Sequence, residues 1–171
     1  MTMKSFMQKA ALAGLLALGA GSAFADVTVT YVKPETFYDL PFATWERDEV
    51  LQQVTDHFVE LGKSLPPGQN LRIEVTDFDP AGRLYPNARA GKDIRVLKGM
   101  ADWPRMDLHY TLEQDGNVIK SGDAKLSDMN YQQNFNRYFD TEPLRYEKRM
   151  IDVWFDKEIA PLKDRRGLAG R

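Results

Sequence analysis

The sequence predicts a single α+β domain, in which a mixed or mostly antiparallel sheet has helices packed on one face. Three observations support this prediction: segments of period-two alternation, a two-residue turn at Asp115-Gly116, and segments with apolar residues at helical spacing. The predicted element order is β-α-β-(β)-β-β-α-α, and the predicted domain spans residues 26–160.

Length and composition exclude several classes of protein. The chain has 171 residues and no cysteine. A domain of this size buries roughly 68–70% of the surface of its unfolded chain, so it folds without disulfides. The lack of cysteine excludes thiol nucleophiles, cysteine-ligated zinc, iron–sulfur clusters and a lipid-modified cysteine. A formal net charge of −2 argues against binding to nucleic acid, which requires an excess of cations.

The first 25 residues have the pattern of a signal peptide. Lys4 and Lys9 precede an apolar run over residues 10–21, and Ala23-Phe24-Ala25 matches the small-x-small pattern of a cleavage site. The run is too short for a membrane span, which needs about 20 apolar residues. We therefore expect cleavage after Ala25, export to the periplasm and no membrane span in the mature chain.

The first elements are a strand, a helix and a second strand. Residues 27–31 alternate as a strand does, and Pro34 ends the run. Thr44 is placed to cap a helix with apolar residues at 50, 54, 58 and 61, and Gly62 ends it. A strand over residues 71–75 follows, and Phe78 is out of phase with it, which predicts a bend or an end there.

The middle of the chain predicts a loop and a hairpin. Residues 79–91 are rich in Pro, Gly and Asn and predict a long loop, and residues 94–97 predict a short edge strand. Residues 105–126 predict a hairpin with a type I′ turn at Asp115-Gly116. Its simple register places Asp123 opposite Leu108 on the core face, so we predict a bulge at Gly122.

Two helices are predicted after the hairpin. Ser127 or Asp128 is expected to cap a short helix over residues 131–139. A final helix with inward residues between 144 and 159 follows Thr141 and Pro143, and Pro161 limits it. Residues 161–171 are polar and are expected to form a disordered tail.

Several motifs in order resemble a bacterial family of exported proteins that is catalogued as a domain of unknown function, numbered 3016. They are Val27 to Phe37 with Pro34-Glu35, residues 77–83 (DFDPAGR), Asp93-Ile94-Arg95, Trp103-Pro104-Arg105, residues 127–131 (SDMNY) and residues 144–148 (LRYEK). The resemblance covers nearly the whole mature chain except the tail. It implies one exported domain, and it implies no reaction, cofactor or catalytic residue.

The candidate site residues are the acids, amides and arginines of these motifs. They are Asp77, Asp79, Arg83, Asp93, Arg95, Arg105, Asp128, Asn130 and Arg145. Three interpretations apply: ion pairs that brace an irregular loop, an anionic ligand held by the arginines, or a hard divalent cation held by the oxygens. The spacing does not match an EF-hand, so we favour pairing and assign no metal and no cofactor.

The sequence offers few groups for nucleophilic catalysis. There are two histidines and no Gly-x-Ser-x-Gly motif, so no catalytic residue is assigned. We interpret His57 as a boundary side chain with one hydrogen bond. We place His109 on a solvated strand face with Asp107 and Thr111.

Four aromatic residues lie between Tyr131 and Phe139 at helical spacing: Tyr131, Phe135, Tyr138 and Phe139. We expect two or three of these rings in the core. If they were exposed together, they would form a stacking platform for a sugar or peptide.

Three functions are compatible with these features. The favoured one is a non-enzymatic periplasmic binding or accessory protein, with an Arg/Asp-rich loop surface and an unidentified ligand or envelope protein as its partner. The first alternative is a carboxylate-based hydrolase that uses Asp77, Asp79 and Asp128, with or without a divalent metal. The second is a structural cell-envelope interaction protein.

Overall fold

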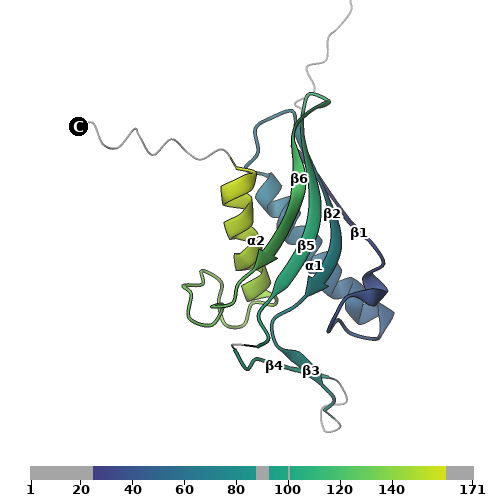
Figure 1. Cartoon of the computed structure of the whole chain (residues 1–171), viewed down its shortest axis with the longest axis vertical. Coiled ribbons are helices and arrows are strands. Elements are labelled where there is room, and N and C mark those ends of the chain that lie inside the picture. The colour runs from purple at the N-terminus through teal and green to yellow at the C-terminus, as the bar shows by residue number, and fades with distance from the viewer. Residues whose placement is uncertain (1–24, 88–92, 100, 161–171) are drawn as a thin grey trace, which may run out of the picture.

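A computed structural model describes residues 25–87, 93–99 and 101–160 (Figure 1). Within these residues, a four-stranded mixed sheet in the order β1-β2-β5-β6 has two α-helices on one face, and β3 and β4 form a separate two-stranded sheet. The predicted fold class is therefore confirmed. The predicted signal peptide, apart from Ala25, and the predicted tail lie outside the described residues. The elements are β1 (Asp26–Tyr31), a 3₁₀ turn (Pro34–Thr36), α1 (Thr44–Gly62), β2 (Gln69–Asp79), β3 (Arg83–Tyr85), β4 (Ile94–Val96), β5 (Arg105–Gln114), β6 (Asn117–Ser127) and α2 (Arg145–Glu158).

The first unit, β1-α1-β2, joins two parallel strands through a helix, as a crossover connection requires. The predicted cap at Thr44 is wrong, because Ala43 occupies the N-cap position and makes no side-chain cap. Gly62 is the last residue of α1, as predicted. A Cβ at Gly62 would lie 2.1 Å from Val27 Cγ2, so the absence of a side chain lets α1 approach β1 closely.

β2 and β5 pair in antiparallel fashion, with a register shift between Val75 and Asp77. This shift is the predicted bend, and it returns Phe78 to the core, where the ring is fully buried. A β-bulge bends a strand in this way because it inserts one residue into the ladder.

The β5–β6 hairpin turns at Asp115 and Gly116, both with positive φ, as a type I′ turn requires. The predicted bulge is real but lies elsewhere: Glu113 pairs with Val118 and Leu112 with Lys120, so Ile119 is the extra residue. Gly122 instead pairs with Tyr110, where a Cβ would lie 3.5 Å from the ring hydroxyl.

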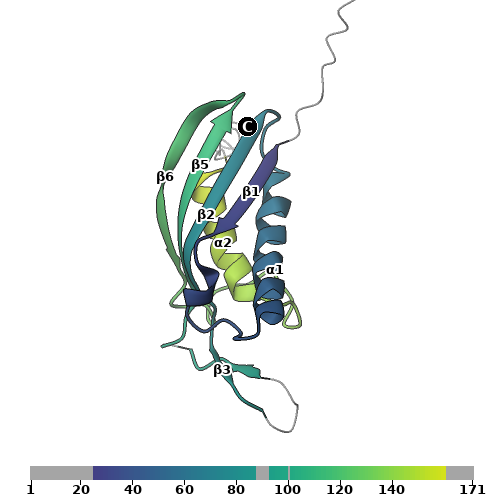
Figure 2. The same cartoon turned by 90° about the vertical axis from the view of Figure 1, so that its right-hand side faces the viewer.

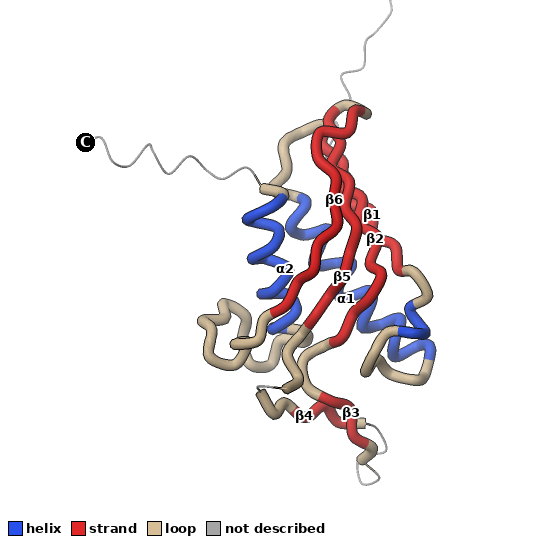
Figure 3. Tube along the Cα trace, in the orientation of Figure 1, coloured by secondary structure: helices blue, strands red, loops and turns tan. Residues whose placement is uncertain are grey.

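The predicted loop over residues 79–91 contains a strand. β3 pairs with β4, so the predicted edge strand at 94–97 belongs to a small separate hairpin rather than to the main sheet. Gly82, with a φ of 86°, turns the chain into β3. Figure 3 shows this hairpin projecting from one end of the main sheet, the same end at which the loop before α2 lies.

The predicted helix after the hairpin is wrong, since residues 128–144 form turns. Asn136 illustrates the reason: its side chain accepts a hydrogen bond from the Tyr138 backbone N–H and donates one to the Arg145 carbonyl, both at 3.0 Å. Such local bonds compete with helical hydrogen bonding. Leu144 precedes α2 with a φ of 54°, so the final helix begins one residue later than predicted.

The hydrophobic core lies between the sheet and the two helices, which Figure 2 shows on the same side of the strands. Trp154 of α2 is central to it, because its ring lies edge-on to Tyr110 of β5 at 5.5 Å and to Phe58 of α1 at 6.1 Å. Ile151 and Phe155 are buried beside it. Among the described residues, no helix has the length and apolar character to cross a membrane.

Candidate functional site

Asp79 is enclosed by two of the predicted arginines. It ends β2, and its side chain is 2% exposed. One carboxylate oxygen accepts a hydrogen bond from Arg83 Nη1 at 3.2 Å, and the other accepts one from Arg105 Nη2. Two guanidinium groups therefore neutralise this carboxylate.

Arg95 pairs with an acid that the sequence analysis missed. Its guanidinium donates to Asp39 Oδ2 at 2.7 Å and to the Asp39 backbone carbonyl at 2.8 Å. Asp39 also accepts from the Leu84 backbone N–H at 3.2 Å, and it has a φ of 56°. Asp and Asn adopt this left-handed conformation more readily than most residues. An aspartate in this proline-punctuated segment could therefore have indicated a turn at Asp39. The pair ties the loop before α1 to the β3–β4 hairpin.

Glu147, another acid absent from the prediction, holds the same region from α2. Its Oε1 accepts from the Ala81 backbone N–H at 2.7 Å. The side chain is fully buried, and this burial raises the pKa of the carboxyl above its usual range against the opposing effect of backbone hydrogen bonds.

Asp128 is held by Arg149 and Asn134. Its oxygens accept from Arg149 Nη1 at 2.5 Å and from Asn134 Nδ2 at 2.7 Å. The sequence analysis missed Arg149, which lies one helical turn after Arg145 in α2. Arg145 itself pairs with the exposed Asp140.

The remaining candidates are exposed. Asp77 lies opposite Asp107 on the face of the sheet away from the helices, and Asp93 and Asn130 lie on loops. The Asn130 carbonyl accepts from two backbone N–H groups, so this residue shapes a turn. In the part of the chain that the structure describes, no group of three or more His, Asp and Glu residues is placed to hold a metal ion. The predicted residues are thus not gathered around one pocket.

His57 is buried and has more partners than expected. Its Nε2 lies 2.9 Å from Asp152 Oδ1 and 3.2 Å from the Lys148 carbonyl, so the interpretation as a boundary residue with one bond is wrong. The Tyr138 hydroxyl donates to the other Asp152 oxygen at 2.8 Å, and burial raises the pKa of Tyr138 to about 12. An open hollow of about 670 Å³ beside this cluster is lined by charges of both signs, including Asp56, Glu60, Arg137, Glu142 and Lys148.

His109 links two residues of the neighbouring strand. Its Nδ1 lies 2.7 Å from Asp123 Oδ1, and its Nε2 lies 3.3 Å from Ser121 Oγ. This is the order of contacts in a Ser-His-Asp triad. However, the His109 and Asp123 side chains are 47% and 89% exposed on an open sheet face. The sequence analysis missed the set because it considered only the neighbours of His109 within β5, Asp107 and Thr111; the predicted bulge at Gly122 would also have placed Asp123 opposite His109.

The four aromatic residues after β6 divide into two pairs. Tyr131 is buried and donates to Asp102 at 2.9 Å, and Tyr138 is partly buried. Phe135 and Phe139 are 87% and 82% exposed. The prediction of two or three rings in the core is therefore wrong, since only Tyr131 is fully buried, and the four rings are not exposed together as a stacking platform requires.

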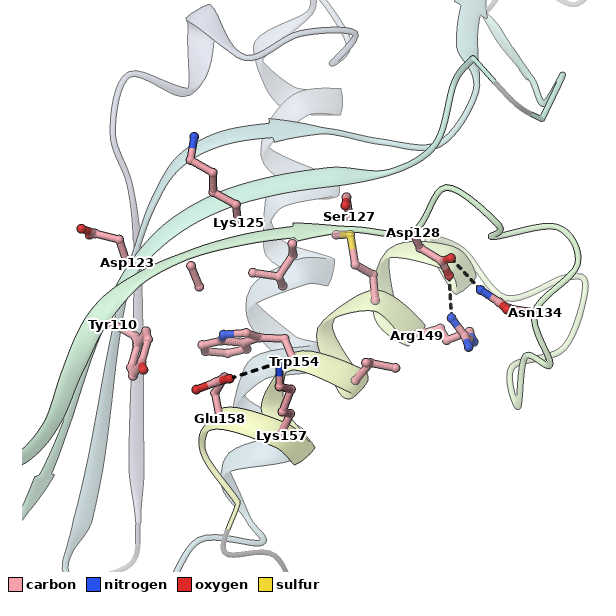
Figure 4. Close-up of a pocket in the computed structure, with 14 residues that line it drawn as sticks. Tyr110, Asp123, Lys125, Ser127, Asp128, Asn134, Arg149, Trp154, Lys157 and Glu158 are labelled. Atoms are coloured by element: carbon pink, nitrogen blue, oxygen red, sulfur yellow. Dashed lines mark hydrogen bonds and ion pairs between the residues drawn. The ribbon is translucent and has the colours of Figure 1, made fainter.

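A groove of about 580 Å³ runs between β6 and α2 (Figure 4). Its floor is apolar and consists of Ala124, Leu126, Met150 and Trp154, while Val153 lies 54% exposed at its side. The Trp154 indole N–H has no hydrogen-bond partner among the described residues. Figure 4 shows the Asp128, Asn134 and Arg149 cluster at one end of the groove and Lys157 and Glu158 toward the other.

A comparison of the sequence with models of known protein families gives one match. The model of a family described as a protein of unknown function, DUF3016, matches residues 25–157. The chain belongs to this family. Among curated proteins and solved structures, none matches the chain.

The DUF3016 match runs from the residue before β1 almost to the end of α2. It therefore includes the buried ion pairs around Asp79 and Asp128 and nearly the whole wall of the β6–α2 groove. These features belong to the DUF3016 domain itself rather than to residues outside it.

Proposed function

We propose that this DUF3016 chain is an exported, non-catalytic accessory protein of the cell envelope that binds a protein partner by adding a strand to β6. The observation that carries the proposal is the position of β6: it is the last strand of the sheet, and an apolar groove runs beside it. An edge strand presents backbone N–H and C=O groups without a neighbouring strand, and an extended peptide can pair with them.

The groove adds side-chain contacts to the backbone hydrogen bonds that the edge of β6 offers. Alternate side chains of an added strand point toward the same face, so half of them would enter the space over Trp154 and Val153. Charged side chains at both ends of the groove would limit its length and orient the strand. The opposite edge, β1, has six residues against eleven in β6 and is packed beside α1, which makes it the poorer acceptor.

The buried ion pairs support a scaffolding role for the predicted Arg/Asp residues. Asp79 and Asp128 each have a cationic partner within hydrogen-bond distance, whereas Asp77 lies on the opposite, solvated face. A carboxylate hydrolase needs two such groups across one substrate, at about 5–9.5 Å for glycosides. The pairs instead brace the end of the sheet from which the loops project.

Export is the second part of this proposal and rests on the signal-peptide pattern of residues 1–25. Mass spectrometry of the protein recovered from a periplasmic extract tests it. A mature chain that begins at Asp26 is expected. A chain that retains residues 1–25 and stays in the cytoplasmic fraction would contradict export.

Strand addition can be tested with eight-residue peptides selected by display on the purified chain. We expect selected peptides to alternate apolar and polar residues and to shift the backbone amide resonances of β6. Val153→Asp should abolish binding, since it places a charge in the groove at an exposed position that leaves the fold intact. Val59→Asp is the matched control, because Val59 is an exposed valine of a helix, α1, is 42% exposed, and lies outside both β6 and the groove. Equal binding by both variants would contradict the proposal.

Hydrolysis is a second candidate function, and the Ser121-His109-Asp123 set is the observation in its favour. Its exposure argues against it, because acyl transfer needs a site that excludes water and donors that stabilise an oxyanion. Activity on activated esters, compared between the wild type and Ser121→Ala, tests this function. We expect no turnover that depends on Ser121; a loss of turnover in the variant would establish an enzyme.

A further inference from the structure

Two opposite charges of β6 flank Ala124, the eighth of its eleven residues. Within β6, residues at equal distances on either side of Ala124 are complementary: one pair is serine with serine, one is glycine with leucine, and one is opposite in charge. These pairs are Ser121 with Ser127, Gly122 with Leu126, and Asp123 with Lys125.

This pattern matches what a twofold axis demands. When two identical strands pair in antiparallel fashion about an axis through one residue, each residue faces its counterpart at equal distance on the other side. An axis through Ala124 places Asp123 of each copy opposite Lys125 of the other. Opposite charges directly across two strands stabilise the pairing, and like charges destabilise it.

The two side chains involved are exposed to solvent, where a second copy can reach them. The Asp123 and Lys125 side chains are 89% and 84% exposed on the open face of the sheet. Within the chain, Lys125 donates to Asp107 at 2.8 Å and Asp123 lies 2.7 Å from His109, each directly across β5. Pairing of two β6 strands would extend these contacts into one row across four strands, in the order Asp107, Lys125, Asp123 of the second copy and His109 of the second copy.

The inner face fits the same arrangement. Gly122 has no side chain and would face Leu126, the one residue of β6 that is buried. The two grooves would then lie side by side under the joined strands. The exposed Val153 of each α2 would be covered by the other copy, which removes apolar surface from water.

We propose that the strand added to β6 is β6 of a second copy of this chain, so that two copies form a continuous eight-stranded sheet with all helices on one face. This proposal rests on the proposed function, because it uses the same edge and groove and names the occupant. The other occupants, unrelated extended peptides, are outcomes of the test.

Charge reversal tests the pairing directly. Sedimentation of the purified full chain is expected to show a dimer, and Asp123→Lys or Lys125→Asp alone should raise its dissociation constant at least tenfold, since each places like charges opposite one another. The double variant, Asp123→Lys with Lys125→Asp, restores opposite charges and should restore the dimer. A double variant as weak as either single variant, or a monomeric wild type, would overturn the proposal.

Disulfide formation tests the register, and the absence of cysteine makes single-cysteine variants clean probes. Ala124→Cys lies opposite itself, and facing residues have Cα atoms about 4.5–5.5 Å apart, within disulfide range. Ser121→Cys should not cross-link with itself, because the axis separates the two copies of residue 121 by roughly 20 Å. A mixture of Ser121→Cys and Ser127→Cys should form the mixed dimer. Equal cross-linking of the Ser121 and Ala124 variants would contradict the register.

Failure of this inference and failure of the proposed function give different results. A monomeric wild type that still binds selected peptides, and loses them on Val153→Asp, overturns the second copy as occupant and leaves strand addition standing. A monomer that binds no peptide at β6 overturns both.

Discussion

Asp79 and Arg105 face each other across β2 and β5, and the Asp79 carboxylate also receives a hydrogen bond from Arg83. Removing a buried charge leaves its partners without compensation, at a cost of about 3–5 kcal/mol for a fully buried pair. Because Arg105 is half-exposed and can be hydrated, we expect Asp79→Ala to lower the free energy of unfolding by about 3 kcal/mol, measured by urea denaturation.

Asp77→Ala is the matched control for Asp79→Ala. Asp77 lies two residues earlier in the same strand and is exposed, so its replacement should change the free energy of unfolding by no more than about 0.5 kcal/mol. Similar effects at the two positions would show that the ion pairs around Asp79 do not brace the fold.

Alanine variants at Gly82 and Gly116 distinguish the cost of backbone strain from the cost of a steric clash. Both have positive φ, 86° and 81°, a conformation that costs a non-glycine residue roughly 1–2 kcal/mol. A Cβ at Gly82 would also lie 2.7 Å from the Val96 carbonyl oxygen, whereas one at Gly116 would have no atom within 4 Å. We expect Gly116→Ala to cost about 1 kcal/mol and Gly82→Ala clearly more, because overpacking adds about 1–3 kcal/mol. If thermal unfolding shows the same loss of stability for both variants, the close contact of a Cβ at residue 82 with the Val96 carbonyl has no cost.

The elements that the sequence predicts well are those with a regular period. The alternation in β2 and β5 and the apolar spacing in α1 and α2 each report a single buried face, so burial and pattern agree. The short β3 strand has no such face. It depends on Gly82 and on contacts with residues far away in the chain, such as Asp39, which no local pattern encodes.

The failures at the candidate site have the same origin. The sequence analysis identified arginines and acids within motifs, but the partners of Arg95 and Asp128 come from separate segments. Moving the bulge from Gly122 to Ile119 leaves Asp123 opposite His109, but it changes the partners of Thr111 and Leu112 to Ser121 and Lys120. A shift of three residues in one bulge is below what period-two patterning resolves, yet it decides which residues of β6 face this part of β5.

Asp152 connects α1 to α2 through His57 and to the preceding loop through Tyr138. We expect Asp152→Ala to lower the free energy of unfolding by about 1–3 kcal/mol, because the buried His57 ring and the partly buried Tyr138 hydroxyl lose this acceptor, whereas the exposed Arg137 remains hydrated. Asp156→Ala, an exposed position on the same helix, is the control and should have little effect in the same urea titrations. A small loss at Asp152 would mean that water replaces its carboxylate.

Glu147 gives the domain a pH dependence whose direction can be stated. Burial raises the pKa of its carboxyl in the folded chain above the ordinary value of 4.5. Above pH 4.5 the unfolded chain therefore binds fewer protons at this residue than the folded chain, and its contribution to stability falls as pH rises until the folded carboxyl also ionises. Glu147→Gln cannot titrate, so the free energy of unfolding of the variant minus that of the wild type should increase with pH across this window. Urea titrations at a series of pH values measure this difference. A difference that stays constant or decreases would show that the hydrogen bond from the Ala81 N–H and the nearby Arg95 guanidinium outweigh the effect of burial.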